Sequence, residues 1–372
     1  MRAWLTTEST GAFFDRSLAG TSDTVARRSN LIRDGLTMTP WRDGLPLWRT
    51  ALSQLPGATF YHCEPWIEAL LGAYPVSLEV ATLHRQGHLR AAAVFARSKR
   101  LFSTRLLALP FSDCAAPLAI DDEARAEFLG ALVSSNQSSS IEIRGAAGPE
   151  PWRNVDCFEH WMLDLKRPFK DISAGFSRTV RSGIKRAVKD RVQIDRGSSA
   201  AYLARFFDLQ LVTRRRLGIP PQPFKFFATV HQKFANGGNC EVWFATLRGR
   251  DEAGLVLLRD GDRLCYKWAA RLEHAHPGAN HLLVARMIEA QAGRASSLDF
   301  GRCDMRNSGL IRSKAEMGCV ARPLTYTFFP NAPRAVSSEV LNGPMKLLSA
   351  VWKRLPLPVT RVLGEALYRY LT

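Results

Sequence analysis

A run of cations at helical spacing stands in the second half of the chain. It reads Arg178-x-x-Arg181-x-x-x-Lys185-Arg186-x-x-Lys189. Intervals of three and four residues place these side chains on roughly one face of a helix. A cationic face of this size suits phosphate groups, such as those of a nucleic acid or a nucleotide. A solvated surface helix has the same pattern, so both interpretations stay open.

A second candidate site is a predicted strand with aromatic residues at alternating positions. Tyr266 and Trp268 lie on either side of Lys267. Because successive side chains of a strand point to opposite faces, we expect both aromatic rings on one side. The rings could line an acyl pocket, and packing in the core explains the pattern equally well.

A carboxylate and several cations follow between positions 299 and 314. Asp299 ends a predicted strand, where its carboxylate could orient an amine or a water molecule, or could simply cap a turn. Ser308 is expected to shape the turn and cap the helix that carries Arg312 and Lys314. Lysine is a compact cation suited to contacting a phosphate or a reaction centre. A surface position for Arg312 or Lys314 is the alternative.

The composition narrows the class of partner. The 372 residues include 51 Lys and Arg against 34 Asp and Glu, a net charge of +17 that favours nucleic acid, nucleotide phosphates or an anionic membrane face. Seven scattered cysteines without a C-x-x-C pair predict reduced thiols in a cytoplasmic protein. Neither Cys nor His has the spacing of metal ligands, so no metal is expected. No apolar run reaches about 18 residues, so no transmembrane helix is expected.

The order of the expected elements predicts an α+β fold. In the second half, three consecutive strands precede helix, strand, helix and strand, and the first half looks like a shorter version of that plan. The expected organisation is a weakly ordered leader at 1–40, domains at 41–168 and 169–332, and a basic tail at 333–372. The tail contains two amphipathic segments, 345–355 and 359–371, which either pack on the body or dock on an anionic membrane.

Four stretches taken together resemble a known family. They are Arg178 to Lys189, Tyr266-Lys267-Trp268-Ala269-Ala270, Asn280-His281-Leu282-Leu283, and Asp299-Phe300-Gly301-Arg302 followed by Asn307-Ser308-Gly309-x-x-Arg312-x-Lys314. Their order resembles the FemAB-like branch of the GNAT-fold acyltransferases. It is most similar to bacterial proteins encoded beside exopolysaccharide and exosortase genes, with a BioF2-like acetyltransferase domain. Those proteins often end in a segment like Trp352-Lys353-Arg354-Leu355-Pro356-Leu357-Pro358. The resemblance covers about residues 45–372.

The resemblance implies two tandem GNAT-like domains with mixed sheets flanked by helices, and a helical tail. It implies transfer of an acyl or aminoacyl group from aminoacyl-tRNA or acyl-CoA to an amino group of a cell-envelope or exopolysaccharide precursor. The donor would be a co-substrate, with no tightly bound cofactor. The family's matching stretch has a lysine at the place of Lys314, which contacts the acceptor's phosphate or the reaction centre. The aromatic residue common before it is replaced here by Ser313.

One departure from the acetyl-CoA pattern concerns residues 271–280. This stretch stands where a Q/R-x-x-G-x-G/A loop would cradle a pyrophosphate, yet it has one glycine, a proline and two histidines. The departure favours a donor other than CoA. Our predicted catalytic residues are Lys314 and Asp299. The predicted substrate-binding residues are Arg178, Arg181, Lys185, Arg186, Tyr266, Trp268, Asn280, Arg302, Ser308 and Arg312.

A different class of function fits the same charge and tail. The alternative is a catalytically silent scaffold or binding protein of an envelope polysaccharide system, held at a membrane surface by residues 333–372. In either case we expect a cytoplasmic protein, with peripheral contact to the inner face of the plasma membrane as a further expectation.

Overall fold

The structure is a computed structural model that describes residues 34–99, 104–136, 139–333, 336 and 349–368. Most of the expected leader and the start of the first tail segment lie outside these residues. The first half contains β1 (Gly35–Pro40), α1 (Trp41–Gln54), the 3-10 turn η1 (Phe60–His62), α2 (Glu64–Ala73), β2 (Ser77–Arg85), β3 (His88–Lys99), β4 (Thr104–Ala108), β5 (Leu118–Ala119), α3 (Asp122–Ser135) and β6 (Ser139–Arg144).

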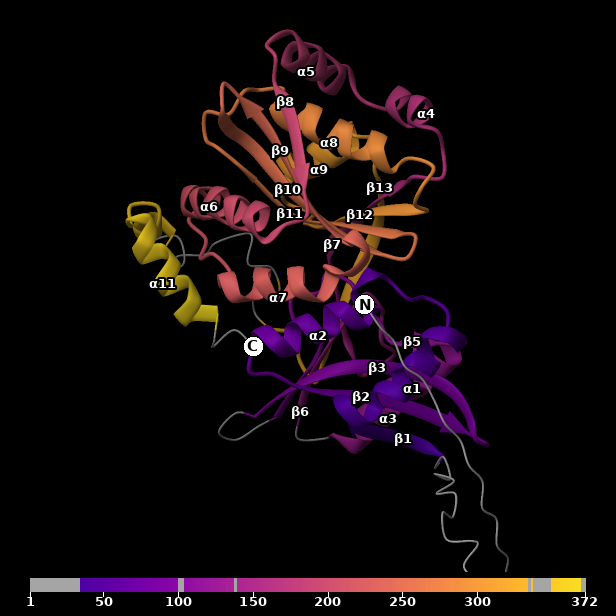
Figure 1. The fold of residues 1–372 in the computed structure, drawn as a ribbon. Helices are drawn as coiled ribbons and strands as arrows, with labels where there is room; N and C mark the ends of the chain where they lie inside the picture. The colour runs from indigo at the N-terminus through magenta and orange to yellow at the C-terminus, as the bar shows by residue number, and fades with distance from the viewer. Residues whose placement is uncertain (1–33, 100–103, 137–138, 334–335, 337–348, 369–372) are drawn as a thin grey trace, which may run out of the picture.

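The first half ends with the long strand β7 (Arg153–Asp164), which extends into the second half (Figure 1). The elements of the second half are α4 (Phe169–Ala174), α5 (Arg178–Lys189), β8 (Gln193–Gly197), α6 (Ala200–Leu217), α7 (Phe224–Phe234), η2 (Asn236–Gly238), β9 (Cys240–Leu247), β10 (Arg250–Asp260), β11 (Arg263–Arg271), α8 (Ala279–Gln291), β12 (Ser297–Asp304), α9 (Ser308–Glu316), β13 (Val320–Phe329) and α11 (Leu357–Tyr368).

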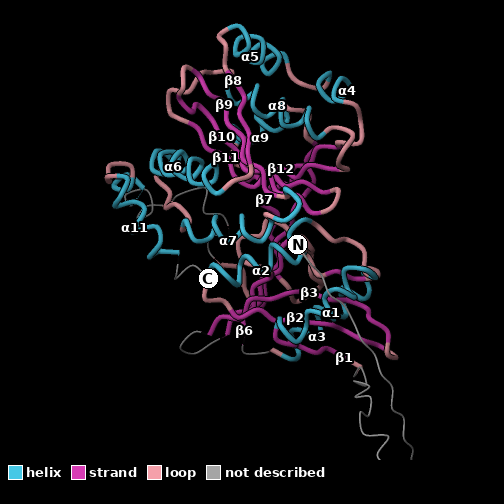
Figure 2. Tube along the Cα trace, in the orientation of Figure 1, coloured by secondary structure: helices cyan, strands magenta, loops and turns pink. Residues whose placement is uncertain are grey.

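The strands form one mixed sheet that runs through both halves, with helices beside it (Figure 2). Its order is β1-β2-β3-β4-β6-β13-β7-β12-β11-β10-β9-β8, with β5 beside β3. The pairs β4–β6 and β11–β12 are parallel and the other pairs along this order are antiparallel. The mixed sheet and its flanking helices confirm the predicted α+β class.

Each half repeats one local plan. In the first half the antiparallel strands β2, β3 and β4 precede α3, and β6 then returns parallel to β4. In the second half the antiparallel strands β9, β10 and β11 precede α8, and β12 returns parallel to β11. A helix is the usual connection between parallel neighbours, because the chain must return to the same end of the sheet.

The two halves exchange their final strands. β7 follows β6 in the chain but pairs with β12, whereas β13 follows β12 but pairs with β6. β7 and β13 also pair with each other, which makes them the centre of the sheet. Side chains from both halves therefore meet at this junction.

Local sequence signals explain where several elements begin and end. Asp121 caps α3, because its side chain accepts a hydrogen bond from the Ala124 amide. α6 ends at Gly218, whose positive φ of 71° is the left-handed conformation that glycine adopts without strain. Gln86 and Gly87 both have positive φ and form the two-residue turn between β2 and β3.

Helices cover both faces of the second half of the sheet. α6 contacts β9, β10 and β11 on one face, where the larger apolar core lies, and α8 contacts β8, β9 and β10 on the other. An aromatic seam joins α7 to the first half. In it, the Trp66 ring lies 5.7 Å from the Phe226 ring, and the Phe60 ring lies 5.6 Å from the Phe234 ring.

The structure differs from expectation at the start of the chain. Residues 35–40, expected in the weakly ordered leader, form β1 and pair with β2. The local sequence is a short alternation of apolar residues and threonines, and its partner strand lies about 45 residues away. Pairing with β2 orders the segment, and the local composition does not reveal this distant partner.

The described part of the tail packs on the body through α11. Gly364 lies against Pro221, where an added Cβ would come within 2.7 Å of the Pro221 carbonyl, and Thr360 is fully buried. The outer face of α11 exposes Val359, Val362, Leu363 and Leu367. Among the described helices, none is both long enough and apolar enough to span a bilayer.

Candidate active site

The candidate site lies where β11 and β12 separate. These strands pair only between residues 263–265 and 297–299, and each then contains a bulge. In β11 the extra residue is Lys267, which has no partner across from Val256 and Leu257. In β12 the bulge contains Gly301, with a positive φ of 72°. Bulges change the direction of neighbouring side chains, so both turn polar groups into the gap.

The Gly301 bulge is fixed by the two residues predicted to be catalytic. Asp299 Oδ1 accepts a hydrogen bond from the Gly301 amide at 2.6 Å. Lys314 Nζ donates to the carbonyls of Gly301 at 2.9 Å and Arg302 at 3.1 Å. Asp299 is 3% exposed and Lys314 is 7% exposed. The structure thus brings the predicted pair together, with both side chains committed to holding the bulge.

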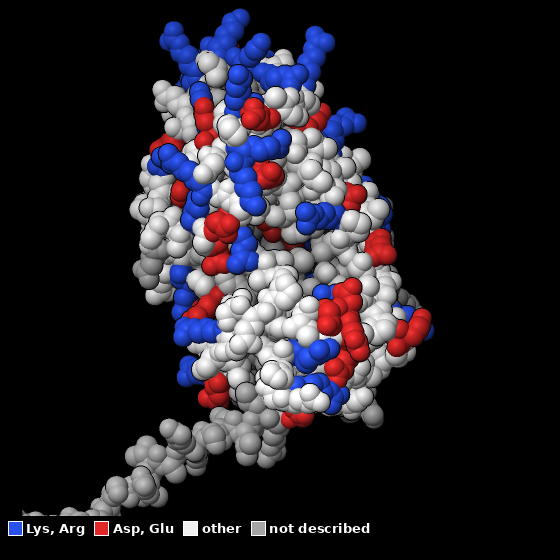
Figure 3. Space-filling view, turned by 90° about the vertical axis from the view of Figure 1, so that its right-hand side faces the viewer, with Lys and Arg blue, Asp and Glu red and all other residues white. Residues whose placement is uncertain are grey.

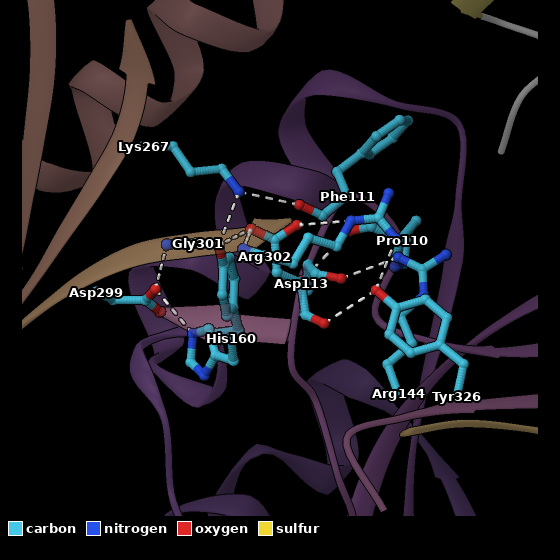
Figure 4. A network of polar contacts seen from close by, with 12 residues as sticks. Pro110, Phe111, Asp113, Arg144, His160, Lys267, Asp299, Gly301, Arg302 and Tyr326 are labelled. Atoms are coloured by element: carbon cyan, nitrogen blue, oxygen red, sulfur yellow. Dashed lines mark hydrogen bonds and ion pairs between the residues drawn. The ribbon is translucent and has the colours of Figure 1, made fainter. Parts of the chain in front are cut away.

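His160 of β7 completes one side of the site (Figure 4). Its Nε2 lies 2.8 Å from Asp299 Oδ1. Burial works against the protonated ring, but the hydrogen bond and charge of Asp299 outweigh it and raise the pKa of His160. A histidine oriented by a carboxylate is a group that can exchange protons near neutral pH.

Asp113 occupies the other side of the site, on a strained loop after β4. Leu109 and Phe111 both have positive φ, an uncommon conformation for residues other than glycine. Tyr61 Oη donates to Asp113 Oδ2 at 2.8 Å, and Arg302 Nε lies 3.5 Å from Oδ1. Burial opposes ionisation of Asp113, but Lys267, Arg302 and the Tyr61 hydrogen bond outweigh it and lower its pKa to about 2.

Lys267 connects this carboxylate to the aromatic wall of the first half. Its Nζ donates to Tyr61 Oη at 3.2 Å and to the Phe111 carbonyl at 3.1 Å. The ammonium also lies 4.5 Å from the ring centroids of Tyr61 and Trp66. Cation–π contacts of this kind hold the charge in place while it stays available to an anion.

Arg302 contacts Tyr326, which joins the remaining residues to the site. Its Nη1 donates to Tyr326 Oη at 3.0 Å, and Tyr326 Oη donates to the Asp113 carbonyl at 3.0 Å. Arg144 lies over the Tyr326 ring at 5.4 Å. We call the whole set the Asp113 cluster: Tyr61, Asp113, Arg144, His160, Lys267, Asp299, Arg302 and Tyr326. The Asp113 and Arg302 side chains are 26% and 27% exposed, so a ligand can reach them.

The prediction that Tyr266 and Trp268 lie on one side of the sheet and could line a pocket is wrong. Tyr266 packs against Phe300, with ring centroids 5.2 Å apart, in the core under α8. Trp268 packs against Phe227 at 4.5 Å in the core under α6. The bulge at Lys267 breaks the alternation, so the two rings lie on opposite faces of the sheet. Both have core neighbours.

The other predicted residues lie apart from the Asp113 cluster. Ser308 and Arg312 are exposed on α9, whose cap is Asn307, not Ser308, because the Asn307 side chain accepts from the Leu310 amide. Asn280 lies in the first turn of α8. The remaining four are exposed on α5: Arg178, Arg181, Lys185 and Arg186. Of the predicted substrate-binding residues, Arg302 alone belongs to the cluster.

Protein atoms already fill the loop before α8, where a pyrophosphate cradle would lie. The Glu252 carboxylate accepts from the His276 amide at 2.7 Å. Helix α5 covers the same place, since a Cβ on Gly278, the α8 N-cap, would lie 2.1 Å from the Gly183 carbonyl oxygen. His276 Nε2 also lies 2.9 Å from Asp190 Oδ2.

Sequence reasoning missed Tyr61, Asp113 and His160. They lie in a 3-10 turn, a loop and a strand of the first half, and none carries a local motif. Among the residues that the structure describes, no three His, Cys, Asp or Glu side chains come together in a way that could hold a metal ion.

The role of Lys314 in fixing the bulge makes a stability prediction. Lys314→Met removes the donor to two carbonyls of β12, and we expect unfolding to become easier by about 1–3 kcal/mol. Chemical denaturation with Lys225→Met, a change of an exposed lysine on α7, as the control measures this. Equal stability of Lys314→Met and the control would contradict the proposed clamp.

Comparisons with known proteins agree with this architecture. Residues 174–306 match the family model described as an acetyltransferase (GNAT) domain. No curated protein matches the chain. The solved structure of FemX is similar, with a TM-score of 0.60 and 13% identity over 76% of this chain and 95% of that chain.

Two other solved structures are more distantly similar. A tandem GNAT protein from the clavulanic acid biosynthesis pathway gives a TM-score of 0.46 at 13% identity, over 78% of this chain and 98% of that chain. L-PGS from Bacillus licheniformis gives 0.48 at 14% identity, over 83% and 97%. Residues 174–306 thus match a GNAT acetyltransferase domain, and the fold of the chain is similar to that of FemX, in agreement with the expected GNAT-like fold.

Proposed function

We propose that this protein is an acyltransferase, which moves an acyl or aminoacyl group from an activated donor to an amino group of a cell-envelope or exopolysaccharide precursor. The observation that carries the proposal is the Asp113 cluster. Two carboxylates, a histidine and three cations from both halves converge where β11 and β12 separate. Acyl transfer needs a positioned amine, a base and a donor to the developing oxyanion, and the cluster contains candidates for each.

In the proposed step the neutral amine attacks the donor carbonyl. A carbon–nitrogen bond forms and the bond from that carbon to the carrier's oxygen or sulfur breaks. His160, oriented by Asp299, takes the proton that the amine loses and returns it to the departing carrier atom. Asp299 and Lys314 act as positioning residues, because each holds Gly301 and so fixes the bulge beside the base.

The cations and Asp113 have separate roles in the proposed step. Lys267 and Arg302 carry positive charge that suits a carbonyl oxygen developing negative charge, or a phosphate of the substrate. Asp113 is ionised at neutral pH because its pKa is about 2. Its carboxylate holds Tyr61 and Arg302 in place and offers a partner to the incoming ammonium form of the acceptor.

The filled loop before α8 supports a donor other than CoA. A pyrophosphate at that position would have to displace the Glu252 carboxylate and the α5 backbone. We therefore propose aminoacyl-tRNA, or another carrier without the CoA pyrophosphate, as the donor. We do not propose the silent scaffold, because residues 174–306 match an acetyltransferase domain.

The predicted domains and location belong to the same proposal. The repeated meander, helix and parallel strand support GNAT-like domains near 41–168 and 169–332, which exchange β7 and β13. No disulfide links the seven cysteines, all of which lie in the described residues. This supports a reducing, cytoplasmic location, and we propose that the protein acts at the inner face of the plasma membrane.

The donor is tested by supplying labelled aminoacyl-tRNA and labelled acyl-CoA, each with a panel of amine acceptors that includes nucleotide-linked envelope precursors. We expect amide product from aminoacyl-tRNA and none above background from acyl-CoA, with chromatographic separation and scintillation counting as the readout. Turnover from acyl-CoA alone would contradict the proposed donor. No product from either donor would contradict the proposed function.

A further inference from the structure

Helix α5 has a strongly cationic surface that the proposed chemistry does not use. It lies at the end of the molecule, away from the Asp113 cluster, and Figure 3 shows Lys and Arg side chains gathered at that end. The helix has no acidic residue. Its exposed cations are Arg178, Arg181, Lys185, Arg186 and Lys189.

A cavity of about 290 Å³ lies beneath this surface, between α4, α5 and α8. Its floor is apolar and includes Phe169, Phe176, Ile184 and Leu282. Arg181 and Lys185 from α5 stand at its edge, together with Arg286 and Glu289 from α8, which form an ion pair at 2.7 Å. The cavity therefore combines an apolar interior with positive charge on its α5 side that is unpaired among the described residues.

The spacing of residues along α5 brings basic and apolar side chains together on one side of the helix. Arg181, Ile184, Lys185 and Val188 follow intervals of three, one and three residues, so they share one side of the helix. Val188 is 52% exposed, so it adds apolar surface to this side of the helix. A basic helix with an apolar stripe lies readily in the interface of a membrane.

We propose that α5 and this cavity, together called the α5 groove, dock the protein on an anionic lipid bilayer. A lipid phosphate lies between Arg181 and Lys185, and the upper part of an acyl chain enters the apolar floor. An RNA would use the cations but would leave the apolar floor and Val188 without a partner, so the observations favour lipid. This inference concerns how the protein reaches a surface and does not depend on the transfer reaction.

Vesicle flotation of the full chain tests the proposal. We expect binding to vesicles of phosphatidylcholine and phosphatidylglycerol at 3:1, and little binding to pure phosphatidylcholine. Arg181→Glu/Lys185→Glu should lower the partition coefficient by about 25-fold or more, at about fivefold for each lost cation. Arg42→Glu/Lys225→Glu changes the net charge equally at exposed residues of α1 and α7, and should bind within about threefold of wild type.

A short-chain lipid tests whether the acyl chain enters the groove or whether charge alone accounts for binding. The lipid is dihexanoyl phosphatidylglycerol, used below its micelle concentration. This lipid should raise the melting temperature of wild type and leave that of Ile184→Asp unchanged. A melting curve without lipid shows whether each variant folds. If Ile184→Asp fails to fold, the flotation result with the charge variants still shows whether α5 docks on anionic lipid.

Several results would overturn the proposal. One is equal binding to neutral and anionic vesicles, and another is wild-type binding by Arg181→Glu/Lys185→Glu. Loss of vesicle binding in Val362→Asp, but not in the α5 variant, would assign docking to the exposed face of α11. Loss of tRNA binding in the α5 variant with unchanged vesicle binding would make α5 a nucleic-acid surface.

Discussion

His160→Gln will lower the rate of amide formation by about 10²–10⁴-fold, the usual contribution of a positioned general base. The glutamine amide can still donate to Asp299, so the bulge and the fold are expected to survive. His231→Gln is the matched control, because His231 lies on α7 and its Nε2 hydrogen-bonds to the Ser198 carbonyl, outside the Asp113 cluster. The readout is the initial rate with the donor and acceptor that the panel identifies.

The pH profile separates a base from a structural histidine. Asp299 raises the pKa of His160, and only the neutral ring can accept a proton, so the rate should rise as pH increases through that raised pKa. Asp299→Asn removes the carboxylate charge but keeps an acceptor for the Gly301 amide. The acid limb of its profile should therefore move to lower pH. An unchanged profile in Asp299→Asn, or wild-type rates in His160→Gln, would contradict the assignment of the base.

Asp113→Asn is expected to have the second large effect, slowing turnover by about 10²–10³-fold. The amide keeps the size of the side chain but leaves Lys267 and Arg302 without the charge that positions them. We also expect the free energy of unfolding to fall by about 1–3 kcal/mol, because Tyr61 loses a charged acceptor.

Two controls distinguish this effect from general damage. Tyr61→Phe removes the hydrogen bond but leaves the carboxylate, so its rate should lie between those of wild type and Asp113→Asn. Asp156→Asn removes an exposed carboxylate that accepts from Thr325, and should leave the rate unchanged. Equal rates for Asp113→Asn and Asp156→Asn would show that the cluster is not organised around Asp113.

Local sequence patterns predicted part of this site. Spacing and the family resemblance directed attention to Asp299, Arg302 and Lys314, and the structure brings all three to the Gly301 bulge. The order of the expected elements also predicted the α+β class, because the hydrophobic pattern of each helix and strand is a local property of the sequence.

The rest of the site depends on contacts that no local pattern contains. His160 meets Asp299 only because β7 leaves its own half to pair with β12, 139 residues away in the chain. Asp113 and Tyr61 reach the gap from a strained loop and a short turn. The bulge at Lys267 reverses the expected alternation, which is why Tyr266 and Trp268 lie on opposite faces. Pairing register and bulges are properties of the assembled sheet.

The most direct test of the account is the single-turnover rate of amide formation in Asp113→Asn, His160→Gln and the double variant. If both residues serve one step at one site, the double variant will be at most about tenfold slower than the slower single variant, because groups that act as a unit are not additive. The account predicts that result, with all three variants folded. Rates in both single variants that match wild type would place the chemistry elsewhere on the molecule.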